Sequence, residues 1–141
     1  MPSSLGLAMS AKRSSESEPS VSVRAVQPIL GCLRARGIEP RAALERAHLD
    51  PGTLANQDAR VAGAQLDALI RAATELCAEP ALPLEFALHI APGTFDVLEY
   101  LARSANTIGQ GLTTFGRYAT ILHDRAEFRI DITGSRALWI F

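Results

Sequence analysis

Polar-tipped aromatic residues and arginines gather in the last third of the sequence. Tyr100 and Arg103 are three residues apart, so a helix would place them on one face. Arg117, Tyr118 and His123 follow on, or just after, the next predicted helix. Ligand pockets are mostly apolar with a few polar groups, so these residues suit a small-molecule pocket between the two helices. The alternative is that the tyrosines lie at the edge of the core with hydrated hydroxyl groups and the arginines are solvated.

The short link between the two helices divides this set. Residues 106–107 join them, and so short a link favours antiparallel packing. That packing brings Tyr118 and His123 toward the start of the first helix. It leaves Arg103 near the link, where we expect it to be solvated or at an interface. If the ligand is acidic, an arginine must point inward, and Arg117 is favoured because it is next to Tyr118 in the sequence. The predicted ligand-binding residues are Tyr118, His123, Tyr100 and Arg117.

Other residues that could do chemistry form no recognisable motif. The histidines His48, His89 and His123 are far apart, and none has a Cys, Asp or Glu at metal-ligand spacing. Gly109-Gln-Gly111 lacks the strand-to-helix context of a phosphate-binding loop. No Gly-x-Ser-x-Gly nucleophile motif occurs. We therefore expect no metal ion, no cofactor and no enzymatic activity.

The two cysteines, Cys32 and Cys77, are too few for a disulfide scaffold. Both fall on or beside apolar helical stripes, which favours buried, reduced thiols in a cytosolic protein. A single bridge between them stays open as an alternative, because sequence alone cannot test its geometry.

Composition and charge indicate one globular domain. The chain has 141 residues, of which 48% are hydrophobic and 21% charged. Fourteen Lys and Arg face 15 Asp and Glu, a net charge of -1, whereas a DNA-binding domain usually carries a basic face. No apolar run approaches the ~18 residues of a membrane span, and no signal peptide is recognisable. We expect a cytoplasmic protein without membrane contact and without DNA affinity of its own.

The first two thirds of the sequence predict a Ser-rich disordered leader followed by helices. Residues 1–20 contain too little apolar surface to offset the entropy of ordering. Pro28 predicts a kink in the first helix, and Gly37 suits a left-handed residue at its end. Asp50 suits an N-cap. Apolar residues at helical spacing predict helices over residues 21–36, 40–47, 51–54, 61–77 and 80–91.

The last third changes from helical to strand periodicity. Thr94 is the predicted N-cap of a helix to about residue 105. Thr107 and Gln110 form a capping box that opens the next helix. Strict alternation of apolar and polar residues then predicts a β-hairpin over residues 126–141, with its turn at 133–136. The predicted fold class is α+β, mostly helical, closing with a C-terminal β-hairpin.

From Val21 onward the sequence resembles the N-terminal regulatory domain of AraC/XylS-type bacterial transcription regulators, a mostly helical domain labelled arabinose-binding by convention. The order and spacing of short segments carry the resemblance, while Pro28 and Gly31 depart from the usual helix formers. The segments are Leu33-Arg-Ala-Arg-Gly37, Ile38-Glu-Pro40, Ala47-His-Leu-Asp-Pro51, Asp58-Ala-Arg-Val61, Glu79-Pro-Ala-Leu82, Tyr100-Leu-Ala-Arg-Ser104 and Thr107-Ile-Gly109, followed by Leu112, Phe115, Arg117 and Tyr118.

The resemblance implies the effector-sensing and dimerisation portion of a regulator. Such regulators continue past a hairpin of this kind and end in a DNA-binding domain with two helix-turn-helix units. Residues 21–141 would then be a partial regulatory domain, truncated before that DNA-binding domain. The implied partners are a small-molecule effector, a second copy of the chain, and DNA only through the missing domain. Two alternatives stay open: a helical protein-interaction module without a ligand, or a small enzyme.

Overall fold

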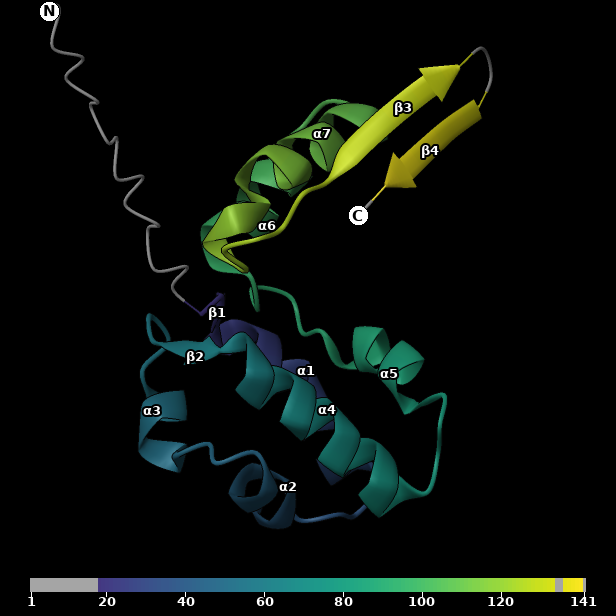
Figure 1. Ribbon diagram of the computed structural model, residues 1–141. Coiled ribbons are helices and arrows are strands. Elements are labelled where there is room, and N and C mark those ends of the chain that lie inside the picture. Colours follow the sequence, from purple (N-terminus) through teal and green to yellow (C-terminus); the bar gives the residue numbers. More distant parts are fainter. Residues whose placement is uncertain (1–17, 134–135, 141) are drawn as a thin grey trace, which may run out of the picture.

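The computed structural model describes residues 18–133 and 136–140 and divides them into two halves (Figure 1). Residues 20–89 hold most of the buried apolar side chains. Residues 96–140 form a helix pair with a hairpin that stands at one end of the first half. The fold is α+β and mostly helical, as predicted.

The first half combines two very short strands with helices. Its elements are β1 (Ser20–Ser22), the 3-10 helix η1 (Val23–Val26), α1 (Gln27–Ala35), α2 (Arg41–Arg46), α3 (Pro51–Ala55), β2 (Arg60–Ala62), α4 (Gly63–Cys77), α5 (Leu82–Glu85) and the 3-10 helix η2 (Phe86–His89). Strands β1 and β2 pair antiparallel, with Val21 opposite Val61. Because α4 follows β2 directly, this pairing fixes where the longest helix begins.

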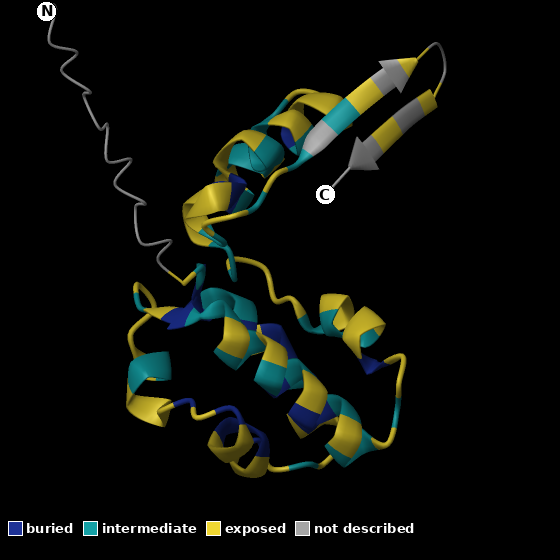
Figure 2. Ribbon diagram, viewed as in Figure 1, coloured by how far each residue is buried: buried dark blue, intermediate teal, exposed yellow. Residues whose placement is uncertain are grey.

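The hydrophobic core lies where α1, α2 and α4 meet, with the dark residues of Figure 2 facing inward. Leu33 of α1 and Leu69 of α4 are both 0% exposed. Leu82 closes the end of this cluster at the start of α5. The apolar spacing that predicted these helices therefore also identified the side of each helix that is buried.

The first helix was predicted to start at residue 21, and this start is wrong. Residues 20–22 form a strand, and a 3-10 turn follows before α1 begins at Gln27. Pro28 consequently lies in the first turn of α1 rather than in a helix interior. Proline is tolerated there because the first N–H groups of a helix have no intrahelical acceptor. The expected kink at Pro28 is therefore replaced by a helix start, and Val61 likewise belongs to β2 rather than to α4.

The connections in the first half follow their predicted chemistry. Gly37 has φ of 71°, the left-handed conformation expected after α1. The Asp50 carboxylate accepts a hydrogen bond from the Thr53 N–H at 3.0 Å and caps α3. Gly37 thus ends the first helix, and Asp50 begins α3.

The predicted helix over residues 80–91 is shorter and less buried than expected. Only one α-helical turn forms in α5, and η2 continues it as a 3-10 helix. Leu84 and Leu88 are 80% and 82% exposed. The sequence is apolar around much of this segment, but only Leu82 is fully buried there.

The second half contains two helices and a hairpin: α6 (Asp96–Arg103), α7 (Ile108–Tyr118), the 3-10 helix η3 (Ala119–Ile121), β3 (Arg129–Thr133) and β4 (Arg136–Ile140). Thr107 caps α7 as predicted, because its hydroxyl accepts a hydrogen bond from the Gln110 N–H. Thr94 does not cap α6. Its hydroxyl donates to the Ala91 carbonyl at 2.6 Å, and α6 begins one residue later, after Phe95.

The C-terminal hairpin is confirmed. Strands β3 and β4 pair antiparallel, with Arg129 opposite Ile140 and Thr133 opposite Arg136. Two residues of the predicted turn, at positions 134–135, lie outside the described residues. The segment before β3 packs on α7, where the rings of Phe115 and Phe128 meet edge to face with centroids 5.7 Å apart.

The boundary of the predicted leader falls inside the folded part. Ser20 belongs to β1, and the Pro19 carbonyl accepts a hydrogen bond from the Gly63 N–H at 2.8 Å. Residues 1–17, which make up most of the predicted leader, lie outside the described residues.

Candidate functional site

An apolar pocket of about 290 Å³ lies between α6 and α7. Its volume is at the lower end of the range of small-molecule sites, about 300 Å³ and above. Most of its wall is aliphatic or aromatic, with one acid and one base at the edge. The lining residues are Phe95, Glu99, Ala102, Arg103, Ile108, Gly111, Leu112 and Phe115.

Helical spacing places these residues on two facing helix surfaces. Phe95, Glu99 and Ala102 follow one another at four- and three-residue intervals along α6. Ile108, Leu112 and Phe115 repeat the same intervals along α7. The two antiparallel helices thus contribute one stripe each, and the pocket is the space between the stripes.

A close backbone contact closes the base of the pocket. Gly111 is buried, and a Cβ atom added there would lie 2.8 Å from the Ala102 carbonyl oxygen. No side chain larger than hydrogen fits at this distance without a shift of α6 or α7. The glycine therefore sets how near the helices lie, and with it the width of the pocket.

The polar edge of the pocket is an ion pair along α6. Arg103 Nε donates to Glu99 Oε1 at 2.7 Å, and the Gly93 N–H donates to Glu99 Oε2 at 2.8 Å. The Glu99 side chain is 15% exposed, whereas that of Arg103 is 70% exposed. Desolvation alone would raise the pKa of Glu99, but the hydrogen bonds from Gly93 and Arg103 and the charge of Arg103 outweigh it and lower this pKa. Glu99 is therefore ionised at neutral pH and holds Arg103 in place.

The four predicted ligand-binding residues do not line this pocket. Tyr100 and Tyr118 are 72% and 41% exposed. Arg117 is exposed and borders a different hollow, which it shares with Ile130 and residues of α7. His123 is half-buried, and its Nδ1 atom accepts a hydrogen bond from the Arg125 N–H at 3.1 Å. Their role in ligand binding stays a prediction.

Two residues of the pocket edge, Glu99 and Arg103, are not among the residues predicted from the sequence to bind a ligand. The sequence predicted that Arg103 is solvated or at an interface. Arg103 is indeed largely exposed, yet it also borders the pocket. The four-residue spacing of Glu99 and Arg103 was the available signal, because opposite charges at that spacing pair on a helix.

His123 instead belongs to the junction between the two halves. Its backbone forms an isolated antiparallel bridge with Val21. On either side, the Ser22 N–H donates to the Leu122 carbonyl and the Asp124 N–H donates to the Ser20 carbonyl. Strand β1 thus pairs with β2 along one edge and with residues 122–124 along the other.

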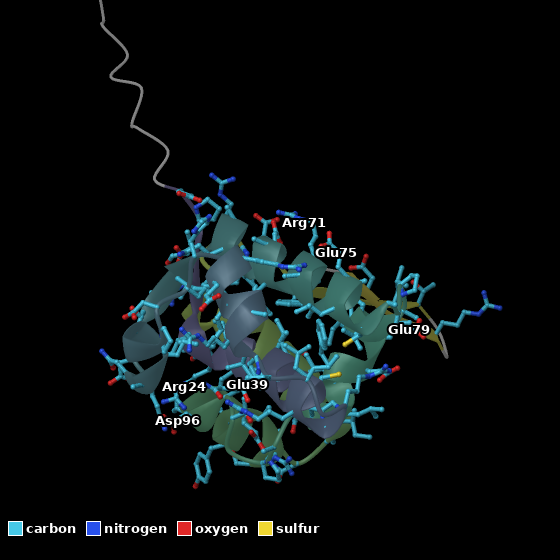
Figure 3. The ribbon with its side chains drawn as sticks, turned by 90° about the horizontal axis from the view of Figure 1, so that it is seen from below. Arg24, Glu39, Arg71, Glu75, Glu79 and Asp96 are labelled. Carbon is cyan, nitrogen blue, oxygen red and sulfur yellow. The ribbon has the colours of Figure 1, made fainter. Side chains whose placement is uncertain are left out.

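Charged side chains reinforce this junction. Arg60 Nη2 donates to Asp124 Oδ1 at 2.6 Å, and Arg24 Nη2 donates to Asp96 Oδ2 at 3.0 Å. Figure 3 shows Arg24 and Asp96 side by side. Asp96 has φ of 48°, an uncommon value for a residue other than glycine, at the start of α6. The Arg24 contact therefore helps fix where the pocket-forming helix begins.

Other candidate chemistry is limited in the described residues. They contain no group of three or more His, Cys, Asp or Glu placed to hold a metal ion. Within the same residues, no helix has the length and apolarity needed to cross a bilayer.

Cys32 and Cys77 are both free thiols, the first buried and the second half-buried. Burial raises the pKa of the Cys32 thiol, which keeps it protonated at neutral pH.

Comparison with known families places this fold in a class of regulatory domains. Residues 37–141 match the family described as the N-terminal arabinose-binding domain of AraC transcription regulators. The match covers α2 to β4, including the whole α6–α7 pocket, and the chain belongs to this family. A search of curated proteins found no match.

Proposed function

We propose that this chain is the effector-sensing and self-associating portion of a bacterial transcriptional regulator that acts in the cytoplasm. DNA would be contacted by a helix-turn-helix domain outside these 141 residues. The single observation that carries the proposal is the apolar α6–α7 pocket, which lies within the residues that match a regulatory domain family. A regulatory domain that responds to a small molecule needs such a pocket to bind it.

The balance of charge supports a separate DNA-binding domain. Lys and Arg total 14 and Asp and Glu total 15. Several arginines are also paired with acids of this chain, as in Arg36 with Glu85 and Arg46 with Glu75. Affinity for duplex DNA depends largely on phosphate contacts from unpaired Lys and Arg. A gel-shift experiment at low salt is expected to show no specific complex with residues 1–141, and a tight specific complex would contradict the proposal.

Exposed apolar residues on the second half support self-association. Ile108 is 84% exposed and Val97 is 50% exposed, and Leu138 of β4 is 61% exposed. Burial of exposed apolar side chains against a second copy of the chain would remove them from water. Sedimentation equilibrium is expected to show a concentration-dependent dimer, and a monomer at all concentrations would remove this part of the proposal.

The pocket is tested with a neutral apolar fluorophore, 1-aminoanthracene. We expect saturable binding to the full chain, and loss of binding in Ala102→Leu, which fills the space between the helices. Leu88→Ala is the matched control, because Leu88 is exposed and lies outside the pocket. Circular dichroism checks that the variants fold. Equal binding by Ala102→Leu and the wild type would show that the fluorophore binds elsewhere. Self-association without any pocket binding would favour the interaction module.

The residues predicted from the sequence remain proposed effector contacts: Tyr118, His123, Tyr100 and Arg117. Tyr118 and Arg117 lie at the end of α7, beyond the pocket wall formed by Phe115. Tyr118→Phe and His123→Ala are the test variants. Unchanged affinity in both, with the fold intact, would remove these residues from the effector site.

A further inference from the structure

We propose that the α6–α7 pocket binds an organic acid whose apolar body lies between the helices and whose carboxylate pairs with Arg103. This inference rests on the proposed function, since it names the ligand class of the same pocket. It follows from which polar groups border the pocket and from which of them already form hydrogen bonds within the protein.

The wall of the pocket selects an apolar body. Phe95, Leu112 and Phe115 present side chains without hydrogen-bonding groups. A sugar carries a hydroxyl on nearly every carbon, and each buried hydroxyl needs a partner to offset the loss of water. Among the described residues that line the pocket, only Glu99 and Arg103 have polar side chains, which is too few to satisfy a polyhydroxylated ligand.

The edge of the pocket selects an anion rather than a cation. Glu99 is the only acid among the described residues that line the pocket, and each of its two carboxylate oxygens already accepts a hydrogen bond, one from Arg103 and one from Gly93. Arg103 uses only Nε in this pair, and its two terminal nitrogens have no hydrogen-bond partner among the described residues. Guanidinium groups bind carboxylates through paired N–H donors, and these remain available.

The amino end of α7 adds to this preference. Ile108, the first residue of α7, lines the pocket, and the first turn of this 11-residue helix contains no acid. The positive end of a helix dipole favours a negative group nearby when no side chain already neutralises it. Arg103 and the start of α7 therefore lie at the same end of an otherwise apolar cavity.

The ion pair with Glu99 gives Arg103 a positioning partner. A free arginine side chain loses conformational entropy when it binds a ligand, whereas one already held by Glu99 has less to lose. Glu99 is thus a positioning residue, and Arg103 is the residue expected to touch the ligand.

The test compares phenylbutyrate with phenylbutyramide, which have nearly the same shape but differ in charge. Isothermal titration at pH 7 measures both against the full-length chain. We expect the acid to bind about tenfold more tightly than the amide, the effect of one charge-assisted hydrogen-bonded pair at a partly exposed position. Higher salt should reduce this preference by screening the charge.

Three variants decide which arginine is responsible. Arg103→Gln is expected to lower the affinity for phenylbutyrate to that for phenylbutyramide and to leave the amide affinity unchanged. Arg103→Lys should keep part of the preference, because it keeps the charge but loses the planar fork. Arg71→Gln is the matched control, an exposed arginine of α4 that lies outside the pocket, and it should behave as the wild type.

The outcomes separate this inference from the proposed function. Equal affinity for the acid and the amide, or an unchanged preference in Arg103→Gln, would overturn the organic-acid proposal while leaving an effector pocket intact. Failure of both compounds and of 1-aminoanthracene to bind would overturn the pocket itself, and both proposals with it. A fourth variant, Arg117→Gln, tests the exposed arginine that borders the neighbouring hollow, and loss of the preference there instead of in Arg103→Gln would move the anion site to that hollow.

Discussion

Arg60 and Asp124, 64 residues apart in the sequence, are joined by a 2.6 Å hydrogen bond between Nη2 and Oδ1. Ser20 completes the contact, because its hydroxyl and its N–H both donate to Asp124 Oδ2. Arg60 also donates to the Ile121 carbonyl at 2.8 Å. Three segments are therefore linked through one carboxylate: β1, β2 and the residues that follow η3. This contact, together with the backbone hydrogen bonds between β1 and residues 122–124, joins the second half to the first.

The first prediction concerns the pH dependence of Asp124. Hydrogen bonds from the Ser20 hydroxyl and N–H, together with the charge of Arg60, lower the pKa of Asp124 below its ordinary value of about 3.9. A lowered pKa in the folded state stabilises the protein above about pH 4, and this contribution is lost as the pH falls through the folded value. Asp124→Asn should therefore be less stable than the wild type at pH 7, and the difference should shrink below pH 4.

Urea unfolding between pH 7 and pH 3 measures this difference. Asp67→Asn is the control, because Asp67 is exposed and has no hydrogen bond or ion pair with any described residue. A constant difference between Asp124→Asn and the wild type over the whole pH range would show that the carboxylate charge is not what stabilises the junction.

The helices of the first half could be predicted because their signals are local. Leu66, Leu69, Ala73 and Leu76 repeat at helical spacing, and Gly37 and Asp50 end and begin helices through their own backbone or side chain. Strands β1 and β2 could not be predicted in the same way. Each has three residues, too few to show a two-residue period, and their pairing joins positions about 40 residues apart. Val21 and Val61 also fit the apolar spacing of the neighbouring helices, so that spacing predicted both residues to be helical, which is wrong.

The site was harder to predict than the fold because it depends on how α6 and α7 are rotated about their own axes, that is, on which side of each helix faces the other. Antiparallel packing of α6 and α7 followed from the short link between them. Which side of α6 faces α7 depends on the contact of Gly111 with Ala102, which the sequence does not reveal. Tyr100 and Arg103 are three residues apart, yet only Arg103 reaches the pocket edge, because Glu99 holds it there.

The second prediction concerns Ala78, which ends α4. Its φ of 50° is in the left-handed region, which costs a residue with a Cβ atom about 1 kcal/mol. Ala78→Gly should therefore raise the free energy of unfolding by about 0.5–1 kcal/mol, measured by urea denaturation. Ala68→Gly, in the middle of α4, should lower it by about 1 kcal/mol. A loss of stability in both variants would mean that the Ala78 side chain stabilises the end of α4.

The third prediction concerns the amino-terminal boundary. Removing residues 2–20 eliminates the Pro19 and Ser20 hydrogen bonds and the pairing of Ser20 with Ala62, so we expect the melting temperature to fall. Removing only residues 2–17 should leave it unchanged, since their composition predicts a segment that buries little apolar surface. Differential scanning calorimetry compares the two deletions. Equal melting temperatures for both would show that the contacts of Pro19 and Ser20 contribute nothing to stability.

The fourth prediction concerns the contact that sets the pocket width. Gly111→Ala would place a Cβ atom 2.8 Å from the Ala102 carbonyl oxygen, a rigid backbone atom, so α6 and α7 must separate. Overpacking of this kind costs about 1–3 kcal/mol. Gly109→Ala is the matched control on the same helix, because nothing lies within 4 Å of its added Cβ. Alanine is the better helix former by about 1 kcal/mol, so this second variant should be more stable than the wild type.

The same pair of variants links stability to ligand binding. Separation of the helices by Gly111→Ala widens the pocket and should weaken 1-aminoanthracene binding, whereas Gly109→Ala should leave that binding unchanged. Urea unfolding and fluorescence titration on the same samples measure both effects. If Gly111→Ala is as stable as Gly109→Ala, the helices can separate without loss, and the contact between Gly111 and Ala102 does not determine the pocket. If Gly111→Ala is destabilised but binds the fluorophore as the wild type does, the fluorophore site does not lie between α6 and α7.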